Sequence, residues 1–236
     1  MRIEGTDHGL TDKRLTEYFL RQKAARERSV PREESPDIPS VITVSRQFGA
    51  GGRSVTSILR DRLGPTWDIW DRELIDAVAM RAEVRREMVQ AMDERHQDWL
   101  GQMVQNVFGG GGMDTQAFRR HLAEVLLALA QQGRKIIVGR GANFVLPDAL
   151  NVRLEADLGF RIKATMERLG LTRDAATTAV RRADRERADF TRGLFEKDIR
   201  DTSAYDLILR TDSLGYETSA EVILTAARRY FAAPSP

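Results

Sequence analysis

The sequence contains no cysteine and only three histidines in 236 residues. A chain without cysteine has no disulfide framework, no thiolate metal site and no cysteine nucleophile. His8, His96 and His121 lie far apart, without the spacing that metal ligands usually show. We therefore expect no metal ion held by cysteines or histidines.

Long apolar runs are also absent. No stretch approaches the roughly 18 residues of a membrane helix, and residues 1–9 do not read as a signal peptide. We therefore expect a cytoplasmic protein without a membrane partner. A length of 236 residues suits one α/β domain of ordinary size, with room for a small lobe.

Lysine is scarce, whereas arginine is abundant: the chain has five lysines and 32 arginines, with a net charge of +2. The near-neutral balance and the lack of aromatic residues interleaved with basic ones argue against a nucleic-acid partner. Arginine forks suit phosphate and carboxylate groups. A GC-rich genome would also raise the arginine content.

The stretch from Val41 to Ser54, VITVSRQFGAGGRS, is the most informative part of the chain. It starts as a short β-rich run and ends as a glycine turn before a helical pattern. Glycine permits a sharp turn and a close approach of the backbone. The N–H groups of such a loop and the start of the helix point at an anion. The order predicts a phosphate-binding loop, with an ordinary strand-to-helix turn as the alternative.

This loop departs from the usual phosphate-binding pattern GxxxxGK[ST]. Arg46 stands at the first glycine position and Gly52 at the lysine position, while Ser54 supplies a hydroxyl group. A loop without its lysine must take positive charge from elsewhere. The candidates are Arg53, beside the missing lysine, Arg46, and an arginine of the later segment that contains Arg181, Arg182 and Arg192.

Strands and helices alternate after residue 40. We expect strands at residues 41–44, 66–70, 135–138, 151–155 and 206–209, and helices at residues 54–63, from 74 onward, 83–108, 115–132, 159–169, 172–190 and 219–231. The run KIIV at residues 135–138 lacks alternation, as is typical of a strand buried on both faces. The alternation predicts a parallel, doubly wound α/β sheet covered by helices on both faces.

Residues 1–40 precede this domain and are polar and charged. An amphipathic helix is expected over residues 10–28, followed by a linker with three prolines over residues 29–40. We expect an N-terminal arm that packs on the domain, residues 41–236, or on a second copy of the chain in a homodimer. A regulatory or partner-binding role is the alternative.

Three further features suit phosphoryl transfer. Asp71 ends the second expected strand, where a carboxylate can act as a base or on the magnesium side, or cap the next helix. A Gly139-Arg140 turn follows a buried strand. The segment AVRRADRERADFTR is rich in arginines, which can neutralise transferring phosphate. Its alternative is a solvated helix face with ion pairs.

Five motifs together resemble the cytidylate kinase-like family, which has a P-loop nucleoside monophosphate (NMP) kinase fold. In chain order they are SRQFGAGGRS, WDRELI, IIVGRGANFVLPDA, ADRERADFTR and YDLIL. The resemblance covers roughly residues 41–231. It implies a core sheet with a helical NMP-binding insertion at residues 79–132 and a lid-like segment at residues 181–200.

The resemblance also implies a set of site residues. Arg140 matches the arginine that grips the acceptor phosphate, and Asp184 and Arg187 match an Asp-x-x-Arg pair that holds ribose and base. Ser54 would stand at the magnesium-side hydroxyl. The donor phosphates would lie against Gly49, Ala50, Gly51, Gly52, Arg53 and Ser54. The catalytic candidates are Arg53, Asp71 and the lid arginines Arg181, Arg182 and Arg192.

The chain departs from true cytidylate kinases at two places. Their loop lysine is Gly52 here, and their Asp-Gly-Arg-Asp turn reads Val138-Gly139-Arg140-Gly141. The missing lysine would normally remove on the order of several kcal/mol of transition-state stabilisation. The missing carboxylate at Gly141 weakens the expectation of a cytidine preference. The pattern SRQFGAGGR nevertheless resembles that of the cytidylate kinase-like subgroup itself.

The predicted function is direct in-line transfer of a phosphoryl group from ATP, with Mg²⁺, to a nucleoside monophosphate, CMP or dCMP first. Two alternatives stay open: a nucleotide-binding regulatory protein that has lost phosphoryl transfer, and a kinase for another small acceptor.

Overall fold

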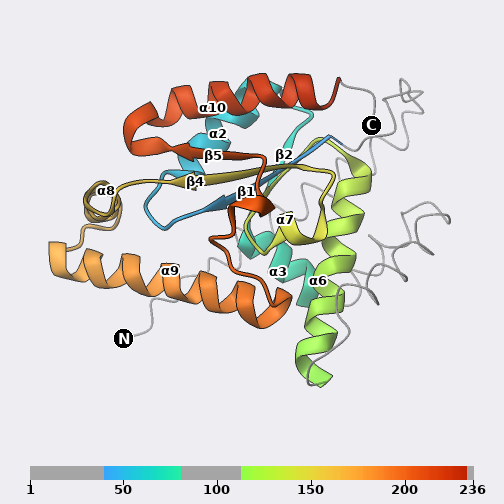
Figure 1. The fold of residues 1–236 in the computed structure, drawn as a ribbon, viewed down its shortest axis with the longest axis horizontal. Coiled ribbons are helices and arrows are strands. Elements are labelled where there is room, and N and C mark those ends of the chain that lie inside the picture. The colour runs from blue at the N-terminus through green and yellow to red at the C-terminus, as the bar shows by residue number, and fades with distance from the viewer. Residues whose placement is uncertain (1–39, 81–112, 233–236) are drawn as a thin grey trace.

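The computed structural model describes residues 40–80 and 113–232. The predicted N-terminal arm, apart from Ser40, and residues 81–112 of the predicted insertion lie outside the described residues. The elements, in chain order, are β1 Val41–Arg46, α2 Gly52–Leu63, β2 Asp68–Trp70, α3 Arg72–Met80, α6 Met113–Gln132, β3 Lys135–Val138, α7 Ala142–Val145, β4 Leu150–Glu155, α8 Leu158–Leu169, α9 Arg173–Phe195, the 3-10 helix η1 Thr202–Ala204, β5 Leu207–Arg210 and α10 Thr211–Tyr230 (Figure 1).

The five strands form one parallel sheet in the order β2-β3-β1-β4-β5. Strand β1 is central, with Val44 paired to Val138 of β3 on one side and to Val152 of β4 on the other. The predicted parallel, doubly wound sheet is confirmed. The chain leaves β1 toward β2 and leaves β3 toward β4, in opposite directions across the sheet. Ligands of open α/β sheets bind at such a point, outside the carboxyl ends of the strands.

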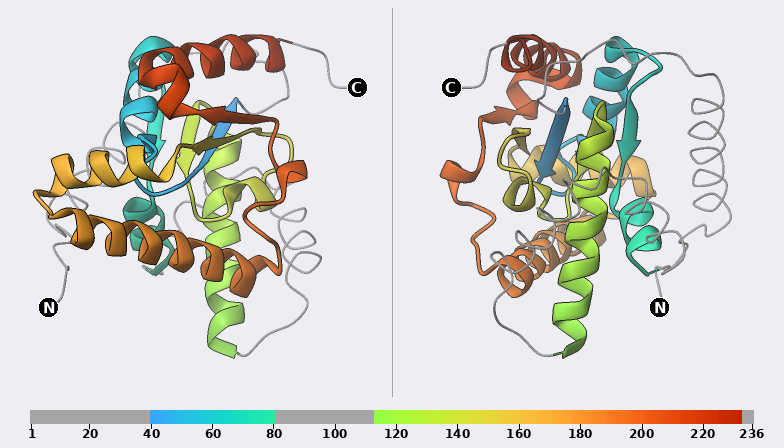
Figure 2. Two further views of the ribbon diagram at one scale, coloured as in Figure 1. Left: turned by 60° about the vertical axis from the view of Figure 1, so that its left-hand side comes forward. Right: turned by 90° about the vertical axis from the view of Figure 1, so that its right-hand side faces the viewer.

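Helices cover both faces of the sheet. Helices α2 and α10 lie on one face, and α3, α6, α7 and α9 lie on the other (Figures 1 and 2). The side chains of β3 divide between the two cores. Ile136 and Val138 pack with the α2 and α10 side, and Ile137 packs with the α6 side, so all of β3 is buried as KIIV predicts.

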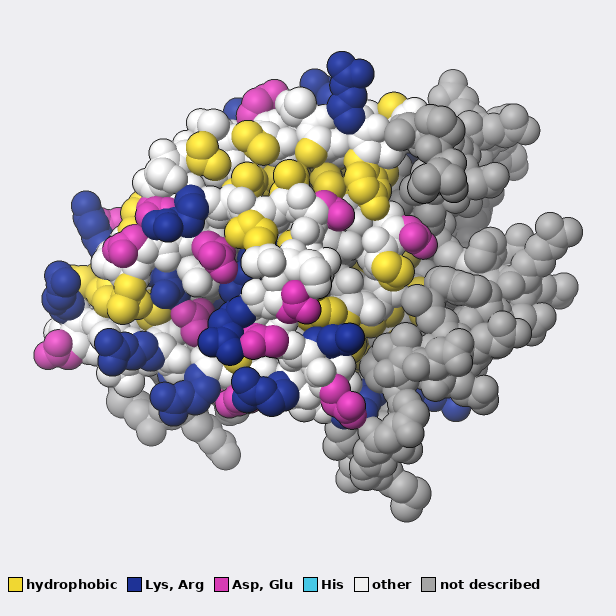
Figure 3. Space-filling model, in the orientation of Figure 1, with side chains coloured by type: hydrophobic (Ala, Val, Ile, Leu, Met, Phe, Trp, Pro, Cys, Tyr) yellow, Lys and Arg dark blue, Asp and Glu magenta, His cyan; other side chains and the backbone are white. Residues whose placement is uncertain are grey.

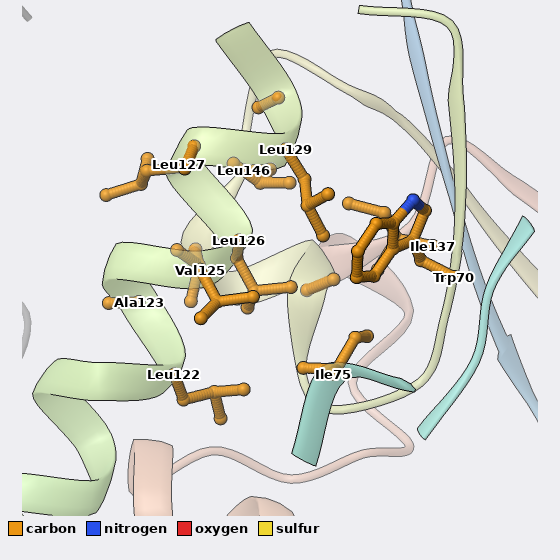
Figure 4. Close-up of a cluster of buried hydrophobic side chains, with 14 of the residues drawn as sticks. Trp70, Ile75, Leu122, Ala123, Val125, Leu126, Leu127, Leu129, Ile137 and Leu146 are labelled. Atoms are coloured by element: carbon orange, nitrogen blue, oxygen red, sulfur yellow. The ribbon is translucent and has the colours of Figure 1, made fainter. Parts of the chain in front are cut away.

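The second half of α6 lies in the core. Leu122, Leu126 and Leu129 are fully buried and face Ile75 of α3 and Trp70 of β2 (Figure 4). This packing stabilises the neighbouring strands through apolar burial, at about 25 cal/mol for each Å² removed from water. The predicted insertion at residues 79–132 therefore ends in a helix that belongs to the core. Its closing over an acceptor stays a prediction.

Two helices extend beyond the bounds that the sequence predicts. Helix α9 continues beyond Phe190, through Gly193, to Phe195, whose ring is buried against Phe144 at 5.7 Å between centroids. Burial of an aromatic ring outweighs the roughly 1 kcal/mol that glycine costs inside a helix. Helix α10 begins at Thr211 and bends at Gly215, which has a φ of 73°.

Candidate active site

The glycine loop joins β1 to α2 at the switch of the sheet. Gly49 and Gly51 have φ values of 82° and 73°. A Cβ atom on Gly49 would lie 2.6 Å from the carbonyl oxygen of Arg161, and one on Gly51 would overlap the ring of Tyr216. Side chains are therefore excluded at both positions. The first turn of α2 contains no acidic residue, so nothing there opposes an anion at the positive end of the helix dipole.

Helix α9 holds this loop in place. The Phe48 N–H donates to Oδ1 of Asp184 at 2.8 Å, and the guanidinium of Arg161 forms an ion pair with Oδ2 of the same carboxylate. Nη1 of Arg187 donates to the carbonyl oxygen of Arg46 at 2.8 Å. The Asp184–Arg187 pair thus binds the loop itself. Its predicted contact with ribose and base stays a prediction.

The ring of Phe48 contacts two guanidinium groups. Cζ of Arg168 is 5.0 Å from the ring centroid and Cζ of Arg187 is 5.4 Å from it. Both distances are within the range of a cation–π contact. Burial lowers the pKa of Arg187 to about 10, and the neighbouring Asp184 carboxylate opposes this shift. The loop is therefore held by side chains from both α8 and α9.

The turn after β3 consists of three successive residues with positive φ. Gly139, Arg140 and Gly141 have φ values of 84°, 56° and 63°. A Cβ atom on Gly141 would overlap the ring of Phe195. The carboxylate that true cytidylate kinases carry at this position is thus sterically excluded by the aromatic ring at the end of α9.

Arg140 forms an ion pair with Asp76 of α3, and its Cζ lies 4.5 Å from the ring centroid of Phe190. Burial raises the pKa of Asp76, although the Arg140 charge opposes the shift, and burial lowers the pKa of Arg140. Within the described part of the chain, Oδ1 of Asp76 and Nε of Arg140 are buried without a hydrogen-bond partner. Each of these two side chains can therefore form a hydrogen bond with one further polar group.

Arg46 extends from the end of β1 between the glycine loop and the turn after β3. An added Cβ on Gly52 would lie 3.0 Å from Cγ of Arg46, and one on Gly139 would overlap the Arg46 guanidinium. Burial lowers the pKa of Arg46 to about 9, with Arg187 as the next cause. Three chain segments thus enclose one partly buried cation.

Asp71 caps helix α3, because its Oδ1 accepts a hydrogen bond from the Leu74 N–H at 3.1 Å. The predicted N-cap is confirmed, and its role as a base or magnesium-side group stays a prediction. Arg53 and Ser54 are exposed in the first turn of α2. With Gly52 at the lysine position, the hydroxyl position of the motif falls on Arg53, and Ser54 is the next residue. The role of Ser54 as the magnesium-side hydroxyl stays a prediction.

The predicted lid arginines Arg181, Arg182 and Arg192 are all exposed. Arg182 lies 3.4 Å from Glu186 and Arg192 lies 3.6 Å from Asp189, as ion pairs along α9. Basic and acidic side chains alternate over the surface of this helix (Figure 3). The arrangement agrees with the alternative of a solvated face, and the catalytic role of these arginines stays a prediction.

Three residues of the site were not found by sequence reasoning: Phe48, Asp76 and Arg161. The signal for Asp76 was a lone carboxylate in the apolar run LIDAVA, which a buried partner must neutralise. Phe48 and Arg161 gave no such signal, because their partners are more than 100 residues away or on another helix.

The described residues contain no group of three or more His, Cys, Asp or Glu side chains placed to hold a metal ion. Among them, no helix is long and apolar enough to cross a bilayer.

Comparisons with known proteins bear on the family and the fold of the chain. A model described as the cytidylate kinase-like family matches residues 41–213. A crystal structure of an uncharacterized protein from Eubacterium ventriosum aligns with a TM-score of 0.63 and 20% identity, over 80% of this chain and 98% of that one. This likeness concerns the fold.

Two further matches are more distant. Shikimate kinase from Bacteroides thetaiotaomicron aligns with a TM-score of 0.43 and 14% identity, over 80% of this chain and 98% of that one. A uronate isomerase from Corynebacterium glutamicum is 28% identical over 116 residues, which are 48% of this chain. The match spans 22% of that curated relative's length.

Proposed function

Since the chain belongs to the cytidylate kinase-like family, we propose that it transfers a phosphoryl group from ATP to a nucleoside monophosphate, with CMP or dCMP as the first acceptor. ATP and nucleoside monophosphates occur together in the cytoplasm, which is where we propose that the reaction takes place.

The observation that carries this proposal is the meeting of two turns with positive φ values at the switch of the sheet. The glycine loop after β1 offers backbone N–H groups, and the turn after β3 presents Arg140. We assign the donor phosphates to the segment Gly49–Ser54 and the acceptor phosphate to Arg140. Adjacent parallel strands set these two turns side by side, as in-line transfer requires.

The chemistry asks for charge neutralisation more than for covalent work. Negative charge spreads over the transferring group, and fixed cations nearby lower the barrier. Arg140 can contribute if the acceptor phosphate shares it with Asp76. Arg53, Asp71, Arg181, Arg182 and Arg192 remain the further catalytic candidates, and Asp184 and Arg187 remain candidates for the acceptor nucleoside.

Magnesium is the ion that this chemistry implies. Mg²⁺ takes most of its ligands from nucleotide phosphates and water, so one or two protein oxygens suffice. The exposed hydroxyl of Ser54 fits that demand, and Asp71 offers a second oxygen at the end of β2. The ion would neutralise charge on the donor phosphates.

The test is a screen of ATP consumption and product formation with the purified protein across all ribonucleoside and deoxyribonucleoside monophosphates. We expect turnover with CMP or dCMP and its loss in the variant Arg140→Met. Lys163→Met serves as a matched control, because Lys163 is an exposed cation on α8. Absence of turnover with every acceptor, in a folded protein, would refute the kinase proposal.

A second candidate function is nucleotide binding without transfer, in a regulatory protein. Two observations favour it: Gly52 carries no charge, and Arg140 is already paired with Asp76. Calorimetry that finds tight binding of ATP or CMP beside a negative turnover screen would support this function. Turnover with CMP would exclude it, and turnover with CMP alone would also exclude a kinase for another small acceptor.

A further inference from the structure

Arg46 occupies the position of the first glycine in the usual phosphate-loop motif, yet its side chain lies against the position of the lysine. Its Cγ is the atom that a Cβ on Gly52 would approach most closely, at 3.0 Å. Gly52 is in the first turn of a regular helix, with no positive φ to demand glycine. The glycine at residue 52 is therefore explained by the room that the Arg46 stem needs.

The guanidinium end of Arg46 likewise excludes a side chain at a second glycine, Gly139. A Cβ on Gly139 would overlap Nη1 of the Arg46 guanidinium. The guanidinium thus lies over the turn that carries Arg140, at the carboxyl ends of β1 and β3. This is the switch of the sheet, where the glycine loop and the turn meet.

The surroundings of Arg46 do not neutralise it. Across the described ranges, its guanidinium forms no hydrogen bond or ion pair. Arg187, Arg72 and Arg140 all lie close enough to disfavour its charge, and Glu73 is the one carboxylate among its leading electrostatic neighbours. An excess of cations around a partly buried site is unfavourable unless an anion occupies it.

We propose that Arg46 binds the phosphates of the nucleotide at the glycine loop, in place of the lysine that the usual motif carries at residue 52. The two positions have exchanged roles. In the usual loop, the positive charge comes from a lysine at the start of the helix, which reaches the phosphates. Here glycine at residue 52 leaves room for an arginine from the end of the strand.

The proposal rests on the proposed function for the identity of the phosphate donor, but not for the presence of the anion site. An arginine fork differs from a lysine in offering two parallel N–H groups to phosphate oxygens. It can therefore contact two oxygens from a fixed position. The loop then needs no positive charge from the exposed Arg53.

The test measures binding of ATP, inorganic pyrophosphate and adenosine by calorimetry in the full chain. We expect Arg46→Gln to weaken ATP and pyrophosphate binding by about 10- to 100-fold, as for loss of a charge-assisted phosphate contact, with adenosine binding unchanged. Arg46→Lys should recover part of the affinity. Arg60→Gln, an exposed arginine at the other end of α2, should bind like the wild type.

A reciprocal exchange sharpens the test. Gly52→Lys and Arg46→Gly should each weaken pyrophosphate binding, and the double variant, which restores the usual motif, should bind at least about tenfold more tightly than either. Thermal melting of every variant verifies that it is folded. A folded double variant that binds no better than the single variants would overturn the exchange of roles.

Two other outcomes are informative. Loss of binding in Arg53→Gln with wild-type binding in Arg46→Gln would overturn the proposal and assign the charge to Arg53. A wild-type protein that binds neither ATP nor pyrophosphate would overturn it as well. Binding that depends on Arg46 without turnover of any acceptor would support this inference and refute the kinase function alone.

Discussion

The arginines around α9 fall into two groups that the sequence does not separate. Arg161 and Arg187 face the glycine loop and bond to its backbone or to Asp184. Arg182 and Arg192 face outward and pair with carboxylates of their own helix. The side chain of Arg161 is 10% exposed, whereas that of Arg192 is 64% exposed.

The difference shows that arginine density is a poor guide to function. Exposed pairs one turn apart contribute little, because water and salt screen them. The inward group instead fixes the geometry of a loop, since its bonds to the carbonyl oxygens of Phe48 and Arg46 join segments more than 100 residues apart. Four predictions can break or sharpen this contrast.

The largest effect is expected for Asp184→Ala. This change removes the acceptor of the Phe48 N–H and leaves the Arg161 guanidinium without its carboxylate. We expect the free energy of unfolding to fall by about 2–3 kcal/mol, as when one partner of a largely buried pair is removed. Urea denaturation measures it. Asp189→Ala, on the outward face, should change stability by no more than about 0.5 kcal/mol. Equal losses of stability in Asp184→Ala and Asp189→Ala would show that the inward and outward groups contribute alike.

Arg140→Met should have the next largest effect. It leaves the Asp76 carboxylate partly buried without its cation, for a loss of about 1–2 kcal/mol. The double variant Asp76→Leu with Arg140→Met should recover most of that stability, because no unpaired charge remains. Arg182→Met is the matched outward control. A double variant as unstable as Arg140→Met would show that packing on Phe190, and not charge, accounts for the loss.

Arg46→Gln should stabilise the protein in the absence of nucleotide. The pKa of Arg46 is lowered on folding to about 9, so the unfolded chain holds this proton more tightly than the folded one. The charge therefore opposes folding at every pH below about 9, and that penalty is relieved as the pH rises above 9. The advantage of the variant should be full at pH 7 and should narrow between pH 9 and 10.5.

Denaturation midpoints of the wild type and Arg46→Gln across this range measure the effect. Arg60→Gln, measured alongside, should follow the wild type. A variant less stable than the wild type at pH 7 would mean that Arg46 is held by favourable contacts, and it would count against an anion site.

The smallest effect on stability is expected for Arg182→Gln and Arg192→Gln, within about 0.5 kcal/mol of the wild type. Turnover distinguishes a catalytic lid from a solvated helix face. If these arginines form a lid, turnover should fall at least about tenfold with unchanged melting temperature. Unchanged turnover would show that they are a solvated face alone.

Much of the fold could be predicted from the sequence because its signals are local. The run KIIV and the alternation of strands and helices predicted the parallel sheet, and Asp71 was correctly expected to cap a helix. The glycine loop was visible because φ values above zero demand glycine at residues 49 and 51.

The organisation of the site could not be predicted, because it depends on distant pairs. No local sequence pattern predicts the hydrogen bond from the Phe48 N–H to Asp184, or the position of the Arg46 guanidinium over Gly139. From the sequence, Gly52 and Gly141 were interpreted as the loss of a lysine and of a carboxylate that true cytidylate kinases carry. The structure explains both as space for another residue, Arg46 in one case and Phe195 in the other.

The bond from the Phe48 N–H to Asp184 spans 136 residues, and β1 pairs with strands that follow it by about 90 to 110 residues. During synthesis the glycine loop therefore leaves the ribosome long before its anchors exist. Contacts of such long sequence separation slow folding. The nascent chain therefore exposes the apolar β1 until β3 and β4 have been synthesised, and unpaired apolar strands of this kind favour aggregation.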